Sequence, residues 1–445
     1  MKAIIFVVAV AFLASPTCAQ DNLAAAAARG DTAAVRVLLA AGANPDQRDK
    51  SGNTSLFVSV GIQEQQSRES IFELLLNAGA NVNARGARGY SPLIYAAERG
   101  CLLCARQLID KGADVDARTD GGEPALSRAL LARDRRIATL LLDSGADPTL
   151  RSSYLDTDPM MAAAWAGFVD IMQRMHARGA TLTRANVDGT TPLHFAAVRD
   201  NAPVIEYLLQ QGAEVDARDA KGVTPLLGAA LEADARTVRL LLSRGAAVHA
   251  TDEAGRTALH RASFNGRVMV MGALREAGAS LEALDAEGNT PLIAATERNR
   301  IAAVEWLLRV GASPHPRNRK GTSALDVAIR LYSEPVASLL IDGGANIDER
   351  DASGDTPLML AVRHGSRGIV GRLLRKGLRV NESNAAGRTA VHEAASSGRV
   401  DLLESLHAAG ADLSVADRRG TTPLAEAVGG NRAEAVRWLS SRGAK

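Results

Sequence analysis

The chain has 445 residues, of which 46% are hydrophobic but only 3% aromatic, and its formal net charge at pH 7 is +2. This balance lacks the strong basic excess of nucleic-acid-binding proteins, so no nucleic-acid partner is expected. No change of composition and no Pro- or Ser-rich linker divides the chain into separate domains.

Residues 1–19 have the pattern of a secretory signal peptide. Lys2 precedes an apolar run over 3–14, and small residues around Ala19 form a cleavage site. The run is shorter than the ~20 apolar residues that a membrane-spanning helix needs, which disfavours an anchor. Lipidation of Cys18 is an alternative. We expect cleavage after Ala19, export with the periplasm preferred over full secretion, and no transmembrane span in the mature chain.

The next segment shows two short helical patterns. Asp21 can N-cap a helix over 23–29, because its carboxylate can accept an unpaired amide of the first turn. A second apolar pattern over 32–41 ends before Gly42, which suits a helix C-terminus. The spacing predicts a helical hairpin.

The same hairpin recurs, and the stretch 186–217 shows it most clearly. Thr191 can N-cap a helix, and Pro192 suits its first turn because proline lacks an amide that would stay unpaired there. A second apolar pattern with helical spacing follows over 204–209. The polar link after it ends in Gly222, which predicts a projecting β-turn finger between consecutive hairpins.

One finger residue before each hairpin shows how regular the repeat is. From position 156 onward it recurs every 33 residues. The interval that ends at Gly89 is longer, and its excess over 61–68 predicts an enlarged loop between two helices. At Asp156 the glycine is lost, which we interpret as drift in a tolerant repeat, with a hinge or a partner-fitted site as the alternative. The series is Gly52, Gly89, Gly122, Asp156, Gly189, Gly222, Gly255, Gly288, Gly321, Gly354, Gly387 and Gly420.

A fixed period of this size is typical of stacked solenoids, and the tetrad that opens each hairpin carries a family resemblance. Its best copy is Thr191-Pro192-Leu193-His194, and similar copies stand at 224–227, 257–260, 290–293, 356–359, 389–392 and 422–425. Weaker copies stand at 54–57, 91–94, 124–127, 158–161 and 323–326. In tetrad and period the chain resembles ankyrin-repeat proteins, here of an exported bacterial type.

The resemblance implies a mainly α fold, in which helix-turn-helix units joined by β-turn or hairpin fingers stack into one solenoid over residues 20–445. We expect about thirteen repeats, including the caps. The N-terminal cap repeat would occupy 21–48, the full repeats 49–416, and the C-terminal cap repeat 417–445.

Cys101 and Cys104 form the one reactive-looking motif. They flank the start of a predicted helix, and their i, i+3 spacing is compatible with a disulfide. A redox function is conceivable, but no thioredoxin-like strand pattern surrounds the pair, and Cys104 falls at a buried apolar position of the repeat. We favour a structural pair or an oxidised staple.

Three histidines, His194, His260 and His392, occupy the fourth position of their tetrads. The family resemblance implies that they hydrogen-bond the tetrad threonine and neighbouring backbone. No histidine pair has metal-ligand spacing, and no phosphate-binding loop or nucleophile elbow occurs. The acidic residues of the fingers fit solvated turns. We therefore expect no catalytic, cofactor-binding or metal-binding residues, no cofactor and no enzymatic activity.

The large side chains divide by their place in the repeat. Tyr207, Trp306 and Trp438 fall at the buried position of the second helix and are expected in the core. Five other aromatic residues fall on finger flanks or on the exposed side of the first helix, which is the concave surface in the family. We expect them to contact a partner. They are Tyr90, Tyr95, Trp165, Phe195 and Phe264.

The sequence therefore predicts a non-catalytic, monomeric scaffold that acts outside the cytoplasm and binds another protein through its concave face. The partner's identity does not follow from the sequence. Two alternatives stay open. One is an exported thiol or redox protein that uses Cys101 and Cys104, and the other is a secreted effector that binds proteins of a foreign cell.

Overall fold

The computed structural model describes residues 22–153 and 156–445. The predicted signal peptide, residues 1–19, and Asp21 lie outside these ranges. The chain divides into two compact units, Met1–Glu214 and Val215–Lys445, which we call the first and the second unit. The prediction that residues 20–445 form one uninterrupted solenoid stays a prediction.

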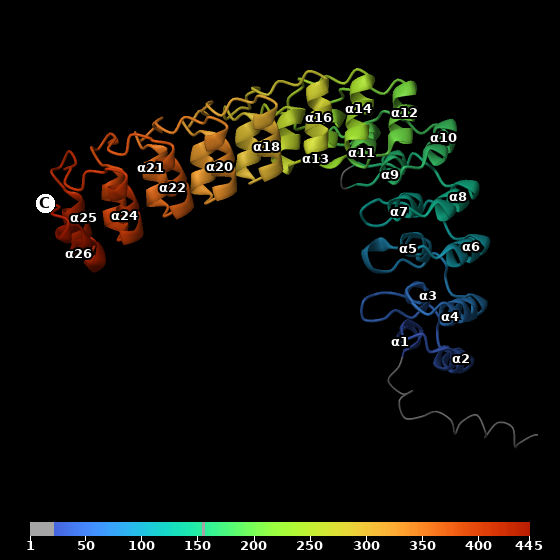
Figure 1. Ribbon diagram of the computed structural model, residues 1–445. Coiled ribbons are helices and arrows are strands. Elements are labelled where there is room, and N and C mark those ends of the chain that lie inside the picture. The colour runs from blue at the N-terminus through green and yellow to red at the C-terminus, as the bar shows by residue number, and fades with distance from the viewer. Residues whose placement is uncertain (1–21, 154–155) are drawn as a thin grey trace, which may run out of the picture. The chain divides into compact units, whose positions relative to one another are not determined.

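The first unit consists of six helical hairpins, in which an odd-numbered helix is followed by an even-numbered helix that packs beside it (Figure 1). The odd-numbered helices are α1 Leu23–Ala28, α3 Ser55–Ser59, α5 Pro92–Arg99, α7 Ala125–Leu131, α9 Pro159–Ala166 and α11 Pro192–Val198. The even-numbered helices are α2 Thr32–Ala40, α4 Gln65–Asn77, α6 Leu102–Asp110, α8 Arg135–Asp143, α10 Val169–Ala177 and α12 Ala202–Gln210. One finger contains a short 3-10 turn, η1 Ala87–Gly89.

The second unit repeats the same hairpin seven times. Its odd-numbered helices are α13 Pro225–Glu232, α15 Ala258–Asn265, α17 Pro291–Glu297, α19 Ala324–Arg330, α21 Pro357–Arg363, α23 Ala390–Ser397 and α25 Pro423–Gly429. Its even-numbered helices are α14 Ala235–Ser243, α16 Val268–Glu276, α18 Ile301–Arg309, α20 Glu334–Asp342, α22 Arg367–Arg375, α24 Val400–Ala408 and α26 Ala433–Ser441.

The predicted mainly α fold is confirmed, because the described residues form thirteen helical hairpins from α1 to α26. In the same residues, β structure is confined to isolated antiparallel bridges at the bases of four fingers. These bridges are Arg48↔Thr54, Arg118↔Pro124, Thr251↔Thr257 and Arg317↔Ser323.

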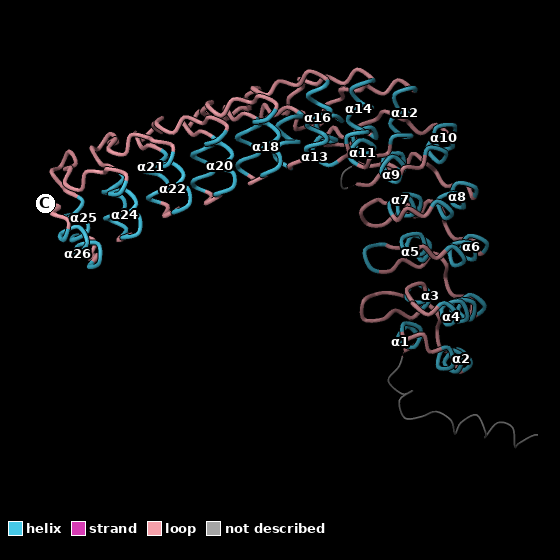
Figure 2. The backbone as a smooth tube through the Cα atoms, viewed as in Figure 1, coloured by secondary structure: helices cyan, strands magenta, loops and turns pink. Residues whose placement is uncertain are grey.

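Each unit has two helical layers. Odd-numbered helices stack on one another in one layer, and even-numbered helices stack beside them in the other (Figure 1). In the first unit the finger loops extend from the odd-numbered layer, on the side away from the even-numbered helices (Figure 2). Small side chains allow this close stacking, since Ala196 and Ala197 of α11 are fully buried beside Leu193. The alanine-rich composition therefore serves thin, closely packed helical layers.

In most repeats the tetrad starts the odd-numbered helix by satisfying amides that have no partner in the first turn. In α15 the amide of His260 lies 3.4 Å from the accepting Thr257 hydroxyl oxygen, and the amide of Thr257 donates to His260 Nδ1 at 3.2 Å. This reciprocal pair is a capping box. Leu259 follows on the buried side and packs into the core.

Most fingers are held by an acidic or amide side chain that accepts backbone amides. Asp252 Oδ1 accepts the amides of Ala254 at 3.0 Å and Arg256 at 2.9 Å. The next finger is attached by its backbone, because the Ala286 amide donates to the Ala254 carbonyl oxygen at 2.9 Å. Gly255 has φ 71°, and a Cβ there would lie 2.8 Å from the Ala286 nitrogen, so this position requires glycine.

Asp156 occupies the one place in this series where glycine is missing. Its φ is 51°, so the aspartate adopts the left-handed conformation that glycine adopts in the other fingers. Arg151 supports it, because its Nε lies 2.6 Å from Asp156 Oδ1 and donates to the Asp156 carbonyl oxygen at 3.0 Å. The finger conformation is thus retained here, and a hinge function stays a prediction.

The extra residues of the second repeat lengthen a helix more than a loop. α4 has 13 residues, whereas α2 and α6 have 9 each. Glu64 caps α4, since its carboxylate accepts the amide of Gln66 at 2.9 Å and that of Ser67. The predicted enlarged loop over 61–68 is therefore wrong in its second half, which is helical.

Two further expectations need correction. The first helix is capped by Asn22 and not by Asp21, because Asn22 Oδ1 accepts the Ala25 amide at 2.8 Å. Trp438 is buried as predicted, but Tyr207 and Trp306 are only half-buried. They lie at the border of the apolar stripe of their helices, where burial is partial.

Among residues 22–153 and 156–445, no helix combines the length and the apolar character needed to cross a membrane.

Candidate protein-binding surface

The helix α11 shows which positions of an odd-numbered helix lie at the edge of the packed core. With the capping residue counted as position 1, positions 3, 6 and 7 are buried, as Leu193, Ala196 and Ala197 show. Positions 5 and 8 of α11 are half-open, at Phe195 and Val198, whereas position 5 is buried in some other repeats, as at Ala162 and Ala294. We call the surface made by positions 5 and 8 and the adjoining finger flanks the inner face.

The tetrad histidines lie behind this face and join neighbouring repeats. His260 Nδ1 accepts the Thr257 amide, so its neutral ring carries the proton on Nε2, which donates to the Asn289 carbonyl oxygen at 2.9 Å. His392 Nε2 donates to the Thr421 carbonyl oxygen at 3.1 Å in the same way. Burial lowers the pKa of both histidines. Their predicted structural role is confirmed.

The aromatic pair Trp165 and Phe195 joins two repeats on the inner face of the first unit. Trp165 on α9 and Phe195 on α11 meet edge to face with ring centroids 6.3 Å apart. The guanidinium of Arg199 lies 4.3 Å from the Trp165 ring centroid. Both rings are half-buried, so the cluster offers apolar area with a cation at its edge.

Tyr95 has a partner that the sequence interpretation missed. Its ring stacks on that of Phe57, with centroids 4.6 Å apart and an interplanar angle of 13°. Phe57 stands at position 4 of its tetrad, where other repeats carry histidine. The contact between Phe57 and Tyr95 could have been predicted from the sequence, because position 4 of one repeat lies near position 5 of the next.

Tyr90 sits in a polar group on the same unit. Its hydroxyl donates to Glu98 Oε2 at 2.8 Å, and burial followed by this hydrogen bond raises the pKa of Tyr90 to about 12. Arg128 lies over the Tyr90 ring at 5.3 Å and pairs with Glu98 at 3.4 Å and with Glu123. Tyr90 is therefore held as a neutral hydrogen-bond donor.

Phe264 belongs to the second unit, on α15. The guanidinium of Arg298 lies 4.5 Å from its ring centroid. The five aromatic residues predicted to contact a partner are all half-buried, and they do not form one cluster. Only Trp165 and Phe195 among the five stack on each other, and contact of the five residues with a partner stays a prediction.

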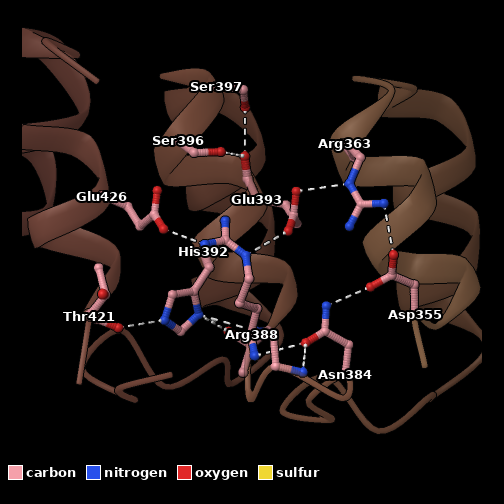
Figure 3. Close-up of polar contacts among 12 residues, drawn as sticks. Asp355, Arg363, Asn384, Arg388, His392, Glu393, Ser396, Ser397, Thr421 and Glu426 are labelled. Atoms are coloured by element: carbon pink, nitrogen blue, oxygen red, sulfur yellow. Dashed lines mark hydrogen bonds and ion pairs between the residues drawn. The ribbon is translucent and has the colours of Figure 1, made fainter. Parts of the chain in front are cut away.

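A chain of charged side chains crosses α21, α23 and α25, and the sequence interpretation missed it (Figure 3). Asp355 lies 2.7 Å from Arg363, which lies 3.0 Å from Glu393. Glu393 in turn lies 3.1 Å from Arg388, which also pairs with Glu426. Two arginines thus alternate with three carboxylates along the inner face.

This charged chain is a built structure and not a set of solvated turn residues. Asp355 and Glu393 are both buried. The hydrogen bond to Glu393 raises the pKa of Arg363, and it outweighs the opposing effect of burial. Burial alone would lower the pKa of Arg388, but its hydrogen bonds to Glu426 and Glu393 raise it. The expectation that the acidic finger residues are merely solvated is wrong for Asp355, the finger residue among these carboxylates.

Cys101 and Cys104 are joined by a disulfide in the structure, with Cα atoms 5.3 Å apart. Cys101 precedes α6 and its sulfur accepts the amide of Cys104 at 3.3 Å. Both residues are buried, with 8% and 2% of their surfaces exposed. An approaching thiol would have little access to either sulfur.

Within the described residues, no group of three or more His, Cys, Asp or Glu side chains is arranged to hold a metal ion. The inner face presents aromatic rings and arginines, which are residue types enriched where proteins contact one another.

The family of the chain follows from its sequence matches. A family model described as ankyrin repeats in three copies matches residues 62–152, 160–252, 226–318, 303–384 and 367–445. A second model, described as ankyrin repeat, matches residues 23–50. These ranges cover most of the chain, which therefore belongs to the ankyrin-repeat family.

Relatives share parts of this repeat array. The mouse B-cell lymphoma 3 protein homolog is 31% identical over 166 residues, which are 37% of this chain and 37% of that protein. The human neurogenic locus notch homolog protein 1 is 32% identical over 142 residues, which are 32% of this chain and 5% of that protein. The chain thus spans less than half the length of these relatives. The crystal structure of the ankyrin repeat domain of Bcl-3 has a TM-score of 0.45 and 31% identity, covering 49% of this chain and 99% of that one.

Proposed function

We propose that this protein is a non-catalytic scaffold that binds another protein through the inner face of its first unit, outside the cytoplasm. Its ankyrin repeats support a role in protein interaction. The hairpins fix the inner face, while positions 5 and 8 vary from repeat to repeat and choose the partner.

The Trp165–Phe195–Arg199 cluster is the observation that carries this proposal. The fold does not need large rings there, because position 5 is Gly228 in one repeat and Ala294 in another. Two half-exposed rings at variable positions bury much apolar area at a small cost in side-chain entropy when a partner covers them. Packing within the chain explains these two large rings less well than binding of a partner does.

Export is the second part of the proposal. The pattern of residues 1–19 and the pairing of Cys101 with Cys104 both support an oxidising compartment, with the periplasm preferred over the medium. An exported thiol or redox function is disfavoured, because both sulfur-bearing residues are buried. A secreted effector would use the same inner face, so only the compartment of its partner separates that alternative.

Site-specific photo-crosslinking in the producing cell tests the proposal. A photoreactive residue at Val198, beside the aromatic pair, should give a discrete adduct with another protein. The same residue at Met269, which is 72% exposed on α16, is the control and should give none. Fractionation of the cell should find the adduct in an exported fraction.

A matched pair of variants decides whether the aromatic cluster is responsible. Trp165→Ala combined with Phe195→Ala should abolish the adduct and leave the far-UV circular dichroism unchanged. Tyr332→Ala removes an aromatic ring that is 63% exposed at the end of α19, and it should keep the adduct. Equal adducts from both crosslinker positions, or an adduct that survives the double variant, would refute the proposed surface.

A further inference from the structure

A small pocket opens on the inner face of the second unit, between α13, α15 and α17. Its volume is about 240 Å³, and its walls include Leu231, Phe264 and Ala294, with Glu297 among the lining residues. Pockets for drug-sized ligands measure roughly 300–1,000 Å³. This pocket therefore suits a single side chain better than a cofactor.

The pocket exists because one repeat position is small. Phe264 stands at position 8 of its repeat, as Trp165 does in the first unit, and each ring has an arginine of the next repeat above it. In the first unit the space beside Trp165 is filled by Phe195 at position 5. The corresponding residue in the second unit is Ala294, so the space beside Phe264 stays open.

The cations around this pocket already have partners. Arg261 lies 2.8 Å from Asp252, and Arg256 lies 3.0 Å from the same carboxylate. Arg298 lies over the Phe264 ring. Lys320 is 3.6 Å from Glu287.

Glu297 is a carboxylate of this pocket that none of these cations contacts. It has no hydrogen bond or ion pair with another described residue, and it stands at the C-terminal end of α17, where the helix dipole disfavours a negative charge. Although Glu297 is exposed at the rim, the crowding of protein atoms around its carboxylate raises its pKa, and the charge of Asp285 raises it further. The positive charge of Lys320 opposes this rise, but Lys320 forms its ion pair with Glu287 and not with Glu297. The pocket thus joins apolar walls to an acid that no cation of the described residues contacts.

We propose that this pocket binds one basic side chain, lysine or arginine, of the protein partner. The aliphatic stem lies against Leu231, Phe264 and Ala294, and the cationic head pairs with Glu297. The inference rests on the proposed function, since it assigns a chemical class to one contact of a protein partner, but it concerns a different unit from the Trp165–Phe195 cluster.

Blocked glycine-rich pentapeptides with one central lysine, arginine, norleucine or glutamate are the probes, and saturation-transfer NMR with the full chain is the measurement. Lysine and arginine peptides should bind in the millimolar range with contacts through their side-chain methylenes. Norleucine should bind about three- to tenfold more weakly, because it keeps the stem and loses the charge. The glutamate peptide should not bind.

Two variants test the pocket itself. Glu297→Gln should reduce lysine binding to the norleucine level. Ala294→Phe copies the side chain that fills this space in the first unit, and it should abolish binding of the lysine, arginine and norleucine peptides. Circular dichroism checks the fold of both variants, and the near-isosteric Glu297→Gln keeps the test valid if Ala294→Phe unfolds.

Val37→Ala is the control, because it alters a residue of α2 in the first unit that is 55% exposed and should leave lysine binding unchanged. The inference fails if no peptide binds, if norleucine or glutamate binds as well as lysine, or if Glu297→Gln has no effect. Such a failure leaves the crosslink from Val198 untouched, whereas loss of that crosslink with intact lysine binding would refute the proposed surface of the first unit alone.

Discussion

The surfaces around Trp165 and Phe264 share one frame and differ at one filled position. An aromatic ring at position 8 lies beneath an arginine of the next repeat in both units, at 4.3 Å for Arg199 and 4.5 Å for Arg298. Beside the first ring stands Phe195, and the residue in the corresponding place beside the second is Ala294. The comparison shows that position 5 decides whether the inner face is filled or hollow, while the helices around it stay the same.

The shared frame gives the largest expected effect. Leu193 and Leu292 hold position 3 in the two units, and each is only 1% exposed. Leu193→Ala and Leu292→Ala should each lower the free energy of unfolding by about 2–5 kcal/mol, because each leaves a cavity in a packed layer. Urea unfolding followed by circular dichroism measures both. No loss in one of them would mean that the two frames are not equivalent.

The disulfide separates the units in a second way, because the first unit contains Cys101 and Cys104 and the second contains no cysteine. A loop this short should contribute about 2 kcal/mol by restricting the unfolded chain. Reduction should therefore speed hydrogen exchange in α6 roughly thirtyfold and leave α18 unchanged. In the double variant Cys101→Ser and Cys104→Ala, the reductant should leave the hydrogen-exchange rate of α6 unchanged. Equal acceleration in α6 and α18 would contradict the prediction.

Exchanging the filled and hollow positions should have the smallest effect on stability. Phe195→Ala removes a half-buried ring and should cost about 1 kcal/mol, since roughly half of its apolar area is already in water. Thermal unfolding measures this change. A loss as large as that of Leu193→Ala would place Phe195 in the core and not on a binding face.

The same exchange can also be read as a gain of function. Phe195→Ala combined with Val198→Glu gives the first unit the small residue and the carboxylate of the second. Saturation-transfer NMR should then show additional contacts of the lysine peptide in the background of Glu297→Gln. Their absence would mean that the pocket depends on more than these two positions.

Much of the fold could be predicted from the sequence because the repeat depends on local rules. Thr191, Pro192 and Gly222 each act within a few residues through capping, a fixed φ or a tight turn. Repetition in a fixed period then marks the same residue type as buried in every unit. Asp156 follows the same logic, since its φ of 51° keeps the finger that a glycine would form.

The errors arise where a neighbouring element decides the outcome. Tyr207 and Trp306 occupy the expected helix positions, but the border of the packed stripe leaves them half-buried. The ion pairs of Arg363 with Asp355 and Glu393 link residues of different repeats, which periodicity alone does not reveal. The pocket beside Phe264 could have been found by aligning Ala294 with Phe195, because the repeat itself supplies the comparison.

His260 and His392 make their joints between repeats sensitive to acid. His260 accepts an amide with Nδ1 and donates to the next repeat with Nε2, so a proton on Nδ1 removes the acceptor. Burial lowers the pKa of His260, and the unfolded chain, with a histidine pKa of about 6.5, takes up the proton first. The stability from this bridge is therefore complete above about pH 6.5 and is lost as the pH falls toward the lowered pKa.

Replacing His260 by the isoleucine that Ile293 supplies at the same position should flatten this part of the pH dependence in urea unfolding at stepped pH. An unchanged slope would assign it to other groups. Acid would thus weaken the contacts between neighbouring repeats before it changes the side chains of the inner face. A partner bound across several repeats would then be released because the repeats move relative to one another.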